Sequence, residues 1–297
     1  MPRVSVVIPT YNRSDHIEAA IQSVLQQTYR DLEIIVCDDR STDNTVEIVR
    51  SIQAISELPV RVEVLSDNLG VSAARNKAIF LSRGELIAFL DSDDSWRPEK
   101  LEKQVDFLDR NPGFIGVGCK HEQISKNGTP RDEYSGNYNL NSSNELFQML
   151  YRCYITTSCF LVKKEVLILA GLFDLTLQKS QDRDLWWRLP RLGRIGYLNE
   201  PLVNYMVHEI NISSEMRNVT GKTYLPIIKK TVWYYRDKLT AKERRKILSN
   251  AHLLVAEDAA AGDYFFLPIR HAVAAMLYGE HYQHALKLIT SKILRFL

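Results

Sequence analysis

The chain has 297 residues, long enough to bury a large core in one or two domains. Hydrophobic residues make up 45% of it and charged residues 25%, a composition typical of a soluble globular protein. No stretch approaches the roughly 20 apolar residues of a membrane-spanning helix, and the N-terminal apolar run is too short for a signal peptide, so we expect a cytoplasmic protein. The net charge of +2 is unevenly distributed: residues 222–297 hold 13 Lys and Arg against 6 Asp and Glu, a net +7, which leaves −5 for residues 1–221.

Strand and helix patterns alternate over the first 120 residues. Continuous apolar or β-branched runs predict strands at VSVVI (4–8), EIIVC (33–37), VRVEV (60–64) and LIAFL (86–90). Apolar residues at helical spacing follow each run, for example Ile17, Ile21 and Val24 after the first, and residues 72–81 after the third. This alternation predicts an α/β fold whose central sheet is mainly parallel and flanked by helices.

The rhythm changes in the second half of the chain. Residues 121–150 are polar and rich in Gly and Asn, which predicts a surface excursion. A strand-like ITTSCFLV (155–162) and a helical KKEVLILAG (163–171) follow. After residue 222 the pattern is helical throughout, with segments that include 225–238, 241–261 and 282–296. We therefore expect a helical C-terminal extension.

Polar residues follow three of the predicted strands: PTYN (9–12), CDDRSTDNT (37–45) and DSDD (91–94). Ligands of an open α/β sheet bind beyond the carboxyl ends of its strands, so these segments should converge on one site. Helix caps explain one aspartate of such a group but not all of them. A divalent cation compensates clustered carboxylates, and Mg²⁺ or Mn²⁺ typically uses one or two of them together with substrate phosphates. The pattern predicts a metal–diphosphate site.

These segments, together with GVSAARNKA (70–78), FLDSDD with SWRPEKL behind it (89–101), GLFD (171–174) and QDRDLWWRL (181–189), resemble the inverting glycosyltransferases of family 2, which have the GT-A fold. The matches occur in order over about residues 3–212. The resemblance implies metal-assisted transfer of a sugar from a nucleoside diphosphate sugar, a UDP-sugar in particular, to an acceptor hydroxyl with inversion. It also implies a GT-A catalytic domain at residues 1–221 and a helical extension at 222–297.

The same resemblance implies roles for individual residues. The donor nucleotide-sugar would contact Pro9, Thr10, Tyr11, Asp39, Arg75, Asp91, Ser92 and Asp93. Asp39 would accept a hydrogen bond from the base, and Asp91 would hold the ribose or the sugar. Asp93 would ligate Mn²⁺ or Mg²⁺, and Asp94 would be a second ligand or a cap. His208 would help to hold the metal or the diphosphate.

Transfer to a hydroxyl also needs a base, and the resemblance implies Asp182 at the start of a predicted helix. Asp184 is the alternative, although it tends away from the face that Asp182 begins. Of Trp186 and Trp187, we expect one in the core and one in the acceptor pocket. Gln181 replaces an acid that is common in the family, which keeps open the alternative of a non-catalytic nucleotide-sugar-binding protein.

Two further positions depart from the family pattern. Arg40 stands where Gly is usual after the aspartate pair, which alters that turn or adds a phosphate contact. Met206 replaces an expected Arg shortly before His208. A phosphoacceptor signalling domain, which also gathers aspartates at strand ends, is the competing class, but it needs an acidic pair after the first strand, where PTYN stands.

The C-terminal segment combines basic and aromatic residues. Its cations include Lys229, Lys230, Arg236, Lys238, Lys242, Arg244, Arg245 and Lys246, beside Trp233, Tyr234 and Tyr235. Basic amphipathic helices with aromatic residues suit contact with an anionic membrane surface, whereas the alternative is a packed helical subdomain with a solvated basic face. A peripheral location at the inner face of the plasma membrane would suit a glycan or lipid-linked glycan acceptor for surface polysaccharide. No nucleic-acid-binding module is recognisable.

Overall fold

The computed structural model describes residues 1–125, 129, 145–152, 155–207, 220–260, 266–278 and 281–296. The chain forms two compact units. The first contains Met1–Leu140, Tyr154–Thr176 and Arg188–His208, and the second contains Asn141–Cys153, Leu177–Trp187 and Glu209–Leu297. These units interleave along the sequence, whereas the predicted domains, 1–221 and 222–297, are consecutive. That domain division stays a prediction.

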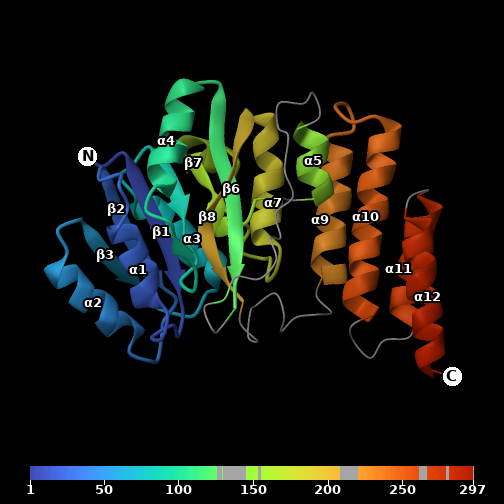
Figure 1. Ribbon diagram of the computed structural model, residues 1–297, viewed down its shortest axis with the longest axis horizontal. Coiled ribbons are helices and arrows are strands. Elements are labelled where there is room, and N and C mark those ends of the chain that lie inside the picture. The colour runs from blue at the N-terminus through green and yellow to red at the C-terminus, as the bar shows by residue number, and fades with distance from the viewer. Residues whose placement is uncertain are drawn as a thin grey trace. The chain divides into compact units, whose positions relative to one another are not determined.

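The first half of the sheet is parallel, as predicted (Figure 1). Strands β1 (Val4–Thr10), β2 (Leu32–Asp38), β3 (Val60–Val64) and β4 (Leu86–Phe89) lie in the order β3-β2-β1-β4. Every residue of β1, β2 and β4 is buried, because helices cover both faces and β-branched side chains fill the space between the layers. In register, Thr10 lies opposite Asp38, so both strands end at one edge.

Three helices connect these strands: α1 (Ile17–Leu25), α2 (Thr45–Ile55) and α3 (Val71–Leu81). A fourth, α4 (Lys100–Arg110), follows them and packs on the second half of the sheet. The chain moves outward from β1 through β2 to β3 and then returns to the other side of β1 for β4. Right-handed crossovers therefore put α3 on the face opposite α1 and α2. The reversal occurs at β1, so the edge between β1, β2 and β4 is the switch point at which open α/β sheets bind ligands.

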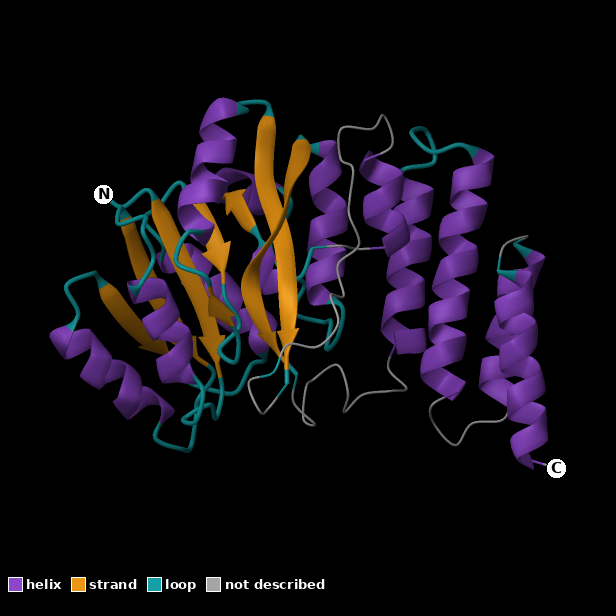
Figure 2. Ribbon diagram, viewed as in Figure 1, coloured by secondary structure: helices purple, strands orange, loops and turns teal. Residues whose placement is uncertain are grey.

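The second half of the sheet is mixed (Figure 2). Strand β7 (Leu161–Lys163) is antiparallel to β4 and to β6 (Phe114–Ile124), β8 (Arg194–Met206) is parallel to β6, and β5 (Ser95–Trp96) is antiparallel to β8. Two predictions were wrong here. Of the strand expected at 155–162, only the end is extended, since residues 157–159 form a 3₁₀ turn. Residues 121–124, expected outside the regular structure, extend β6 because β8 pairs with them.

The second unit is helical. It holds α5 (Glu145–Arg152), nearly all of α7 (Gln181–Arg188), α9 (Thr220–Tyr234), α10 (Ala241–Ala260), α11 (Phe266–Leu277) and α12 (Tyr282–Phe296). Trp187 lies at the centre of its packing: its indole N–H donates to the carbonyl of Met149 at 3.2 Å, and its own carbonyl accepts from the hydroxyl of Tyr235 at 2.9 Å. None of the helices that the structure describes is long and apolar enough to cross a membrane.

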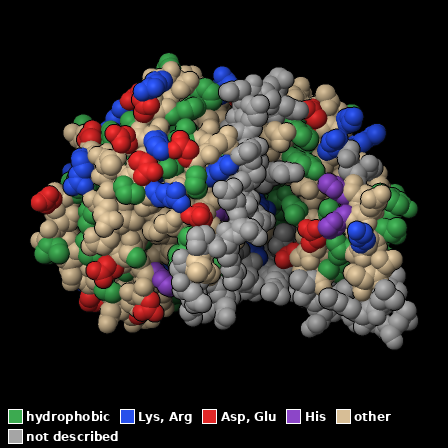
Figure 3. Space-filling model, in the orientation of Figure 1, with side chains coloured by type: hydrophobic (Ala, Val, Ile, Leu, Met, Phe, Trp, Pro, Cys, Tyr) green, Lys and Arg blue, Asp and Glu red, His purple; other side chains and the backbone are tan. Residues whose placement is uncertain are grey.

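Trp186 and Trp187 are both fully buried. We expected one of them in an acceptor pocket, but neither ring is exposed to solvent in the structure. Figure 3 shows that basic and acidic side chains are both spread over the drawn face of the first unit, so the uneven charge along the sequence does not form a single-sign surface there.

Candidate active site

The loops that follow β1 and β2 are joined by hydrogen bonds at the carboxyl edge of the sheet. The backbone N–H of Asn12 donates to Ser41 Oγ, and Asn12 Oδ1 accepts from the N–H of Thr42, both at 2.8 Å. The N–H of Arg13 donates to Thr45 Oγ1, also at 2.8 Å. Two of the three polar strand ends predicted to converge therefore form one continuous turn structure.

The two aspartates at the end of β2 are buried, and both accept hydrogen bonds from backbone N–H groups. Asp38 accepts from the N–H of Ser41 at 2.7 Å. Asp39 accepts at both oxygens, from the N–H of Leu69 at 2.7 Å and from that of Gly70 at 2.8 Å. Gly70 precedes α3 with φ +89°, a conformation that favours glycine. The first observable role of Asp39 is thus to fix the start of α3, and its contact with a base stays a prediction.

Arg40 occupies a backbone position that explains the family's preference for glycine. Its φ is +66°, in the left-handed region. Its side chain is largely exposed and forms an ion pair with Asp67 at 2.7 Å. The departure from the pattern therefore adds a side chain without removing the turn.

Arg75 and Asp91 meet, although 16 residues separate them in the sequence. Arg75 Nη2 lies 2.6 Å from Asp91 Oδ1, and its guanidinium lies over the ring of Phe173, 5.3 Å from the centroid. Arg75 is 6% exposed, whereas the side chain of Asp91 is 31% exposed. Arg75, which the sequence placed at the donor site, is thus paired with an aspartate of the acidic motif, and the carboxylate of Asp91 is still partly exposed to solvent.

Asp94 is buried and accepts hydrogen bonds that fix the acidic turn of residues 91–94. It is 3% exposed; Ser158 Oγ donates to Oδ2 at 2.5 Å and the N–H of Met206 donates to Oδ1 at 3.1 Å. Burial, ahead of the neighbouring charges of Asp93 and Asp91, raises the pKa of Asp94 well above its ordinary value. Two roles were expected for Asp94, a cap or a second metal ligand. The cap fits this buried, hydrogen-bonded environment better.

Ser158 is a site residue that the sequence did not indicate. Its hydroxyl donates to Asp94 and accepts the N–H of Asp91 at 3.1 Å, and its carbonyl accepts the indole N–H of Trp96 at 2.9 Å. Nothing in the apolar run that contains it distinguishes this serine from a core residue. Only the packing of β4 against β7 brings it to the acidic turn.

The other predicted donor-site residues surround the same edge. Pro9 and Thr10 are buried at the end of β1, whereas Tyr11 directly after it is exposed. Ser92 is buried and Asp93 is half-buried in the acidic turn. Exposed and enclosed positions alternate here, and Tyr11, Asp91 and Asp93 are the most exposed of these side chains.

The structure does not place the other two predicted residues, Asp182 and His208, at this edge. Asp182 is half-buried in α7 and belongs to the second unit, where its Oδ1 accepts from the N–H of Arg183 at 2.8 Å. His208 falls outside the described residues. Within the described ranges, no group of three His, Cys, Asp or Glu side chains could hold a metal ion by itself. The carboxylate of Asp93 is a hard oxygen ligand, which suits a cation whose remaining ligands include phosphate oxygens.

Comparison with known proteins identifies the family of the chain. Residues 5–169 match the model of the family described as Glycosyl transferase family 2. The chain is 40% identical over 220 residues to the UDP-Glc:alpha-D-GlcNAc-diphosphoundecaprenol beta-1,3-glucosyltransferase WfaP of Escherichia coli, which covers 72% of this chain and 81% of that protein.

Solved structures share the fold. S. aureus TarS 1-349 in complex with UDP-GlcNAc superimposes with a TM-score of 0.70 at 19% identity, over 98% of this chain and 89% of that one. The mannosyltransferase PcManGT from Pyrobaculum calidifontis, in complex with GDP-Man and Mn²⁺, gives a TM-score of 0.62 at 20% identity, over 99% and 85%. The GT-A fold expected from the sequence is confirmed.

Proposed function

Since the chain belongs to glycosyl transferase family 2, we propose that it transfers a sugar from a nucleoside diphosphate sugar to an acceptor hydroxyl with inversion. A UDP-sugar is the favoured donor, because WfaP is named for UDP-Glc and TarS was solved with UDP-GlcNAc. The observation that carries the proposal is the pairing of Arg75 with Asp91 at the sheet's switch point, beside the half-buried Asp93.

The donor would lie along this edge. Pro9, Thr10, Tyr11 and Asp39 would contact the nucleotide, and Asp91 and Ser92 would contact the ribose or the sugar. Arg75 orients Asp91 through their ion pair and leaves one side of that carboxylate to solvent. Asp94 and Ser158 fix the turn of residues 91–94 through buried hydrogen bonds. Asp91 and Asp93 would therefore contact the ligand with little rearrangement.

The reaction is a single displacement. The acceptor hydroxyl oxygen attacks the anomeric carbon on the face opposite the diphosphate, and the bond from that carbon to the diphosphate oxygen breaks. The electron pair leaves with the diphosphate, and the hydroxyl proton passes to a base. Asp182 is the proposed base, a role that contributes about 10²- to 10⁴-fold in rate.

Mn²⁺ or Mg²⁺ is the proposed cofactor, and the Mn²⁺ bound to PcManGT supports it. Asp93 would hold the ion, with His208 as a further ligand. The bound ion would offset the negative charge of the diphosphate. Asp93 provides the hard oxygen ligand that such an ion prefers.

The acceptor is proposed to be a glycan or lipid-linked glycan used for surface polysaccharide, in line with the diphosphoundecaprenol substrate in the name of WfaP. We place the enzyme in the cytoplasm, peripheral at the inner face of the plasma membrane. Residues 1–221 would form the catalytic domain, and the basic helices of residues 222–297 would contact the membrane.

The first test is a thermal shift of the purified chain against a panel of nucleoside diphosphates and nucleotide sugars, with and without Mn²⁺. A ligand that binds only the native state raises its melting temperature, so we expect a Mn²⁺-dependent rise with the donor. Asp93→Ala should abolish the Mn²⁺ dependence. Absence of any rise with every member of the panel would contradict the donor site.

Turnover is tested separately with the identified donor. Asp182→Ala should keep donor binding and lower the rate of transfer about 10²- to 10⁴-fold. The matched variant Asp184→Ala on the same helix should keep the wild-type rate. Unchanged turnover in both Asp93→Ala and Asp182→Ala would refute the mechanism. The anomeric configuration of the product, read by NMR, tests inversion. Donor binding without product would instead support the non-catalytic alternative.

A further inference from the structure

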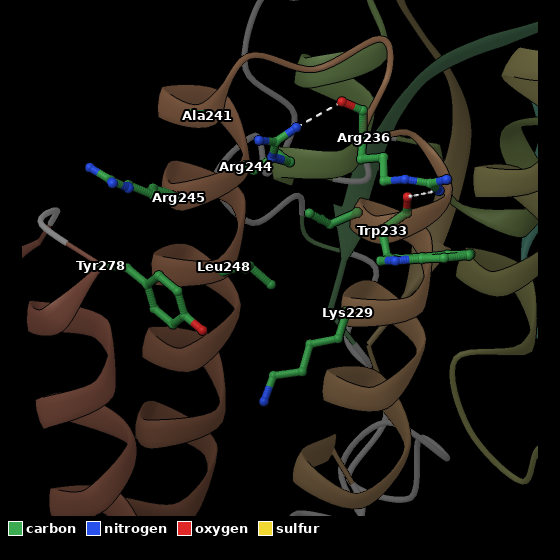
Figure 4. Close-up of a pocket in the computed structure, with 9 residues that line it drawn as sticks. Lys229, Trp233, Arg236, Ala241, Arg244, Arg245, Leu248 and Tyr278 are labelled. Carbon is green, nitrogen blue, oxygen red and sulfur yellow. Dashed lines mark hydrogen bonds between the residues drawn. The ribbon is translucent and has the colours of Figure 1, made fainter.

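The second unit contains a groove that the transfer reaction does not use. It has a volume of about 870 Å³ and lies between α9, α10 and the end of α11 (Figure 4). The groove is lined by Lys229, Val232, Trp233, Arg236, Ala241, Arg244, Arg245, Leu248 and Tyr278. Four of these nine residues are cationic and none is acidic.

The four cations have no acidic partner among the described residues. Arg244 Nη1 donates to the carbonyls of Arg236 at 2.7 Å and Leu239 at 3.1 Å, and Arg236 Nη1 donates to the carbonyl of Trp233 at 3.1 Å. Lys229 and Arg245 are exposed and make no hydrogen bond within the described part of the chain. None of the four forms an ion pair with a carboxylate of a described residue. Their charge is therefore available to a ligand.

The surrounding sequence strengthens this positive field. Residues 229–246 contain eight Lys and Arg but only two acids, Asp237 and Glu243. Glu243 is already engaged as a helix cap: its Oε2 accepts from the N–H of Thr240 at 2.7 Å and from its hydroxyl at 2.8 Å. That carboxylate caps α10 and does not pair with a lining cation.

Exposed apolar side chains flank the groove. Trp233 is 65% exposed, and the guanidinium of Arg236 lies over its ring, 4.2 Å from the centroid. Leu277, next to the lining residue Tyr278, is 82% exposed. Figure 4 shows Lys229 and Tyr278 reaching into the space from α9 and from the end of α11, with Leu248 between them. Cationic heads beside exposed aromatic and aliphatic groups match the headgroup region of a bilayer.

We propose that this groove binds the phosphate groups of anionic phospholipid headgroups. Guanidinium and ammonium groups are the side chains that bind phosphate oxygens, and here they gather around one hollow. Trp233 and Leu277 contact the lipid beside the seated headgroups. The inference rests on the membrane contact proposed above and names its site, but it does not depend on glycosyl transfer.

The test is co-sedimentation of the full chain with phosphatidylglycerol vesicles, with phosphatidylcholine vesicles as the uncharged comparison. Lys229→Gln/Arg245→Gln removes two lining cations that make no hydrogen bond or ion pair with a described residue. Lys230→Gln/Lys242→Gln is the matched control, since it removes two exposed cations of the same helices from outside the groove. Each basic residue near an anionic surface strengthens binding about five-fold. We expect about 25-fold weaker binding for the first pair and less than about three-fold for the second.

Tryptophan fluorescence gives an independent reading. Trp96, Trp186 and Trp187 are buried, so the exposed Trp233 reports contact with lipid. Its emission should shift to shorter wavelength with phosphatidylglycerol vesicles, and Lys229→Gln/Arg245→Gln should lose that shift at the same lipid concentration. Circular dichroism of both variants checks that they fold.

Three outcomes would overturn the proposal. Equal losses in the two variants would mean that diffuse charge, not the groove, attracts the membrane. Binding of inorganic diphosphate that depends on Lys229 and Arg245, without vesicle binding, would assign the groove to a free anion. Absence of binding both to phosphatidylglycerol vesicles and to inorganic diphosphate would mean that the groove binds no phosphate ligand. Since the donor thermal shift is measured without vesicles, each result is separable from the fate of the transferase proposal.

Discussion

The Arg75–Asp91 ion pair predicts an asymmetry between two substitutions. Arg75 is 6% exposed, but the side chain of Asp91 is 31% exposed. Asp91→Asn leaves a buried guanidinium with a neutral partner that water cannot replace. Arg75→Met leaves a carboxylate that can hydrate, while the new side chain keeps most of the apolar contact with Phe173. Asp91→Asn should therefore destabilise the chain more than Arg75→Met does.

The expected magnitudes follow from burial. Two unit charges 4 Å apart attract by about 4 kcal/mol at an effective dielectric constant of 20, and removing one member of a buried pair costs about 3–5 kcal/mol. Asn still accepts a hydrogen bond, so we expect about 3 kcal/mol for Asp91→Asn. Rehydration of Asp91 limits Arg75→Met to about 1 kcal/mol, and the double variant should lose about 1.5 kcal/mol, because the stranded charge is gone.

The measurement is urea unfolding of the two single variants and the double variant, each fitted for midpoint and slope. The matched control is Asp67→Asn, which breaks the Arg40–Asp67 pair at 2.7 Å, nearly the same distance as the 2.6 Å of the buried pair, but with both side chains largely exposed. Its cost should stay below about 0.5 kcal/mol. Equal losses for Asp91→Asn and Arg75→Met, or a double variant as unstable as the two losses added together, would refute the reasoning.

Three further predictions concern stability. Ser158→Ala removes a donor from the buried carboxyl of Asp94 and should lower the unfolding free energy by about 2 kcal/mol; a urea midpoint that does not move would contradict it. Gly70→Ala should lower the unfolding free energy by about 1 kcal/mol, because Gly70 has a φ of +89°. Gly113→Ala is the control and should be nearly neutral in the same urea melts, since a Cβ there likewise meets no atom within 4 Å but φ is ordinary. Burial, ahead of nearby positive groups, lowers the pKa of His252 from 6.5 to about 4, so the unfolded chain takes up a proton at a higher pH than the folded chain does. The stability present above pH 6.5 should therefore be lost as the pH falls toward 4, by up to about 3 kcal/mol. His252→Gln should flatten that dependence of the unfolding free energy on pH.

The elements that were predicted well are those whose signals are local. The β-branched runs before residue 90 form β1 to β4, and the helical spacings between them form α1 to α3. The errors occur where a partner strand decides the conformation. Residues 121–124 are polar enough to suggest a loop, but backbone hydrogen bonds to β8 hold them in β6. Pairing across distant segments leaves little periodicity in either one, so no local pattern could indicate it.

The candidate site was predicted in outline for the same reason. Because parallel strands end at one edge, the convergence of the polar turns after β1 and β2 could be expected from the order of the elements. A place for Arg75 at the donor site was implied only by the family resemblance. Ser158 could not, because it comes from an apolar run with no motif. The burial of both Trp186 and Trp187 was also beyond the sequence, since a helix pattern does not show how many of its faces are covered.

The sequence by itself determined which residues are aspartates and which strands they follow, and that was enough to predict at which edge of the sheet they gather. Only the tertiary structure decided what each carboxylate does there. Asp39 is occupied by two backbone N–H groups, Asp91 faces Arg75 and solvent, and Asp94 is enclosed by Ser158 and Met206, which lie 64 and 112 positions away along the chain. Identical side chains acquire different roles through burial and partners, and both arise from contacts between residues that are distant in sequence.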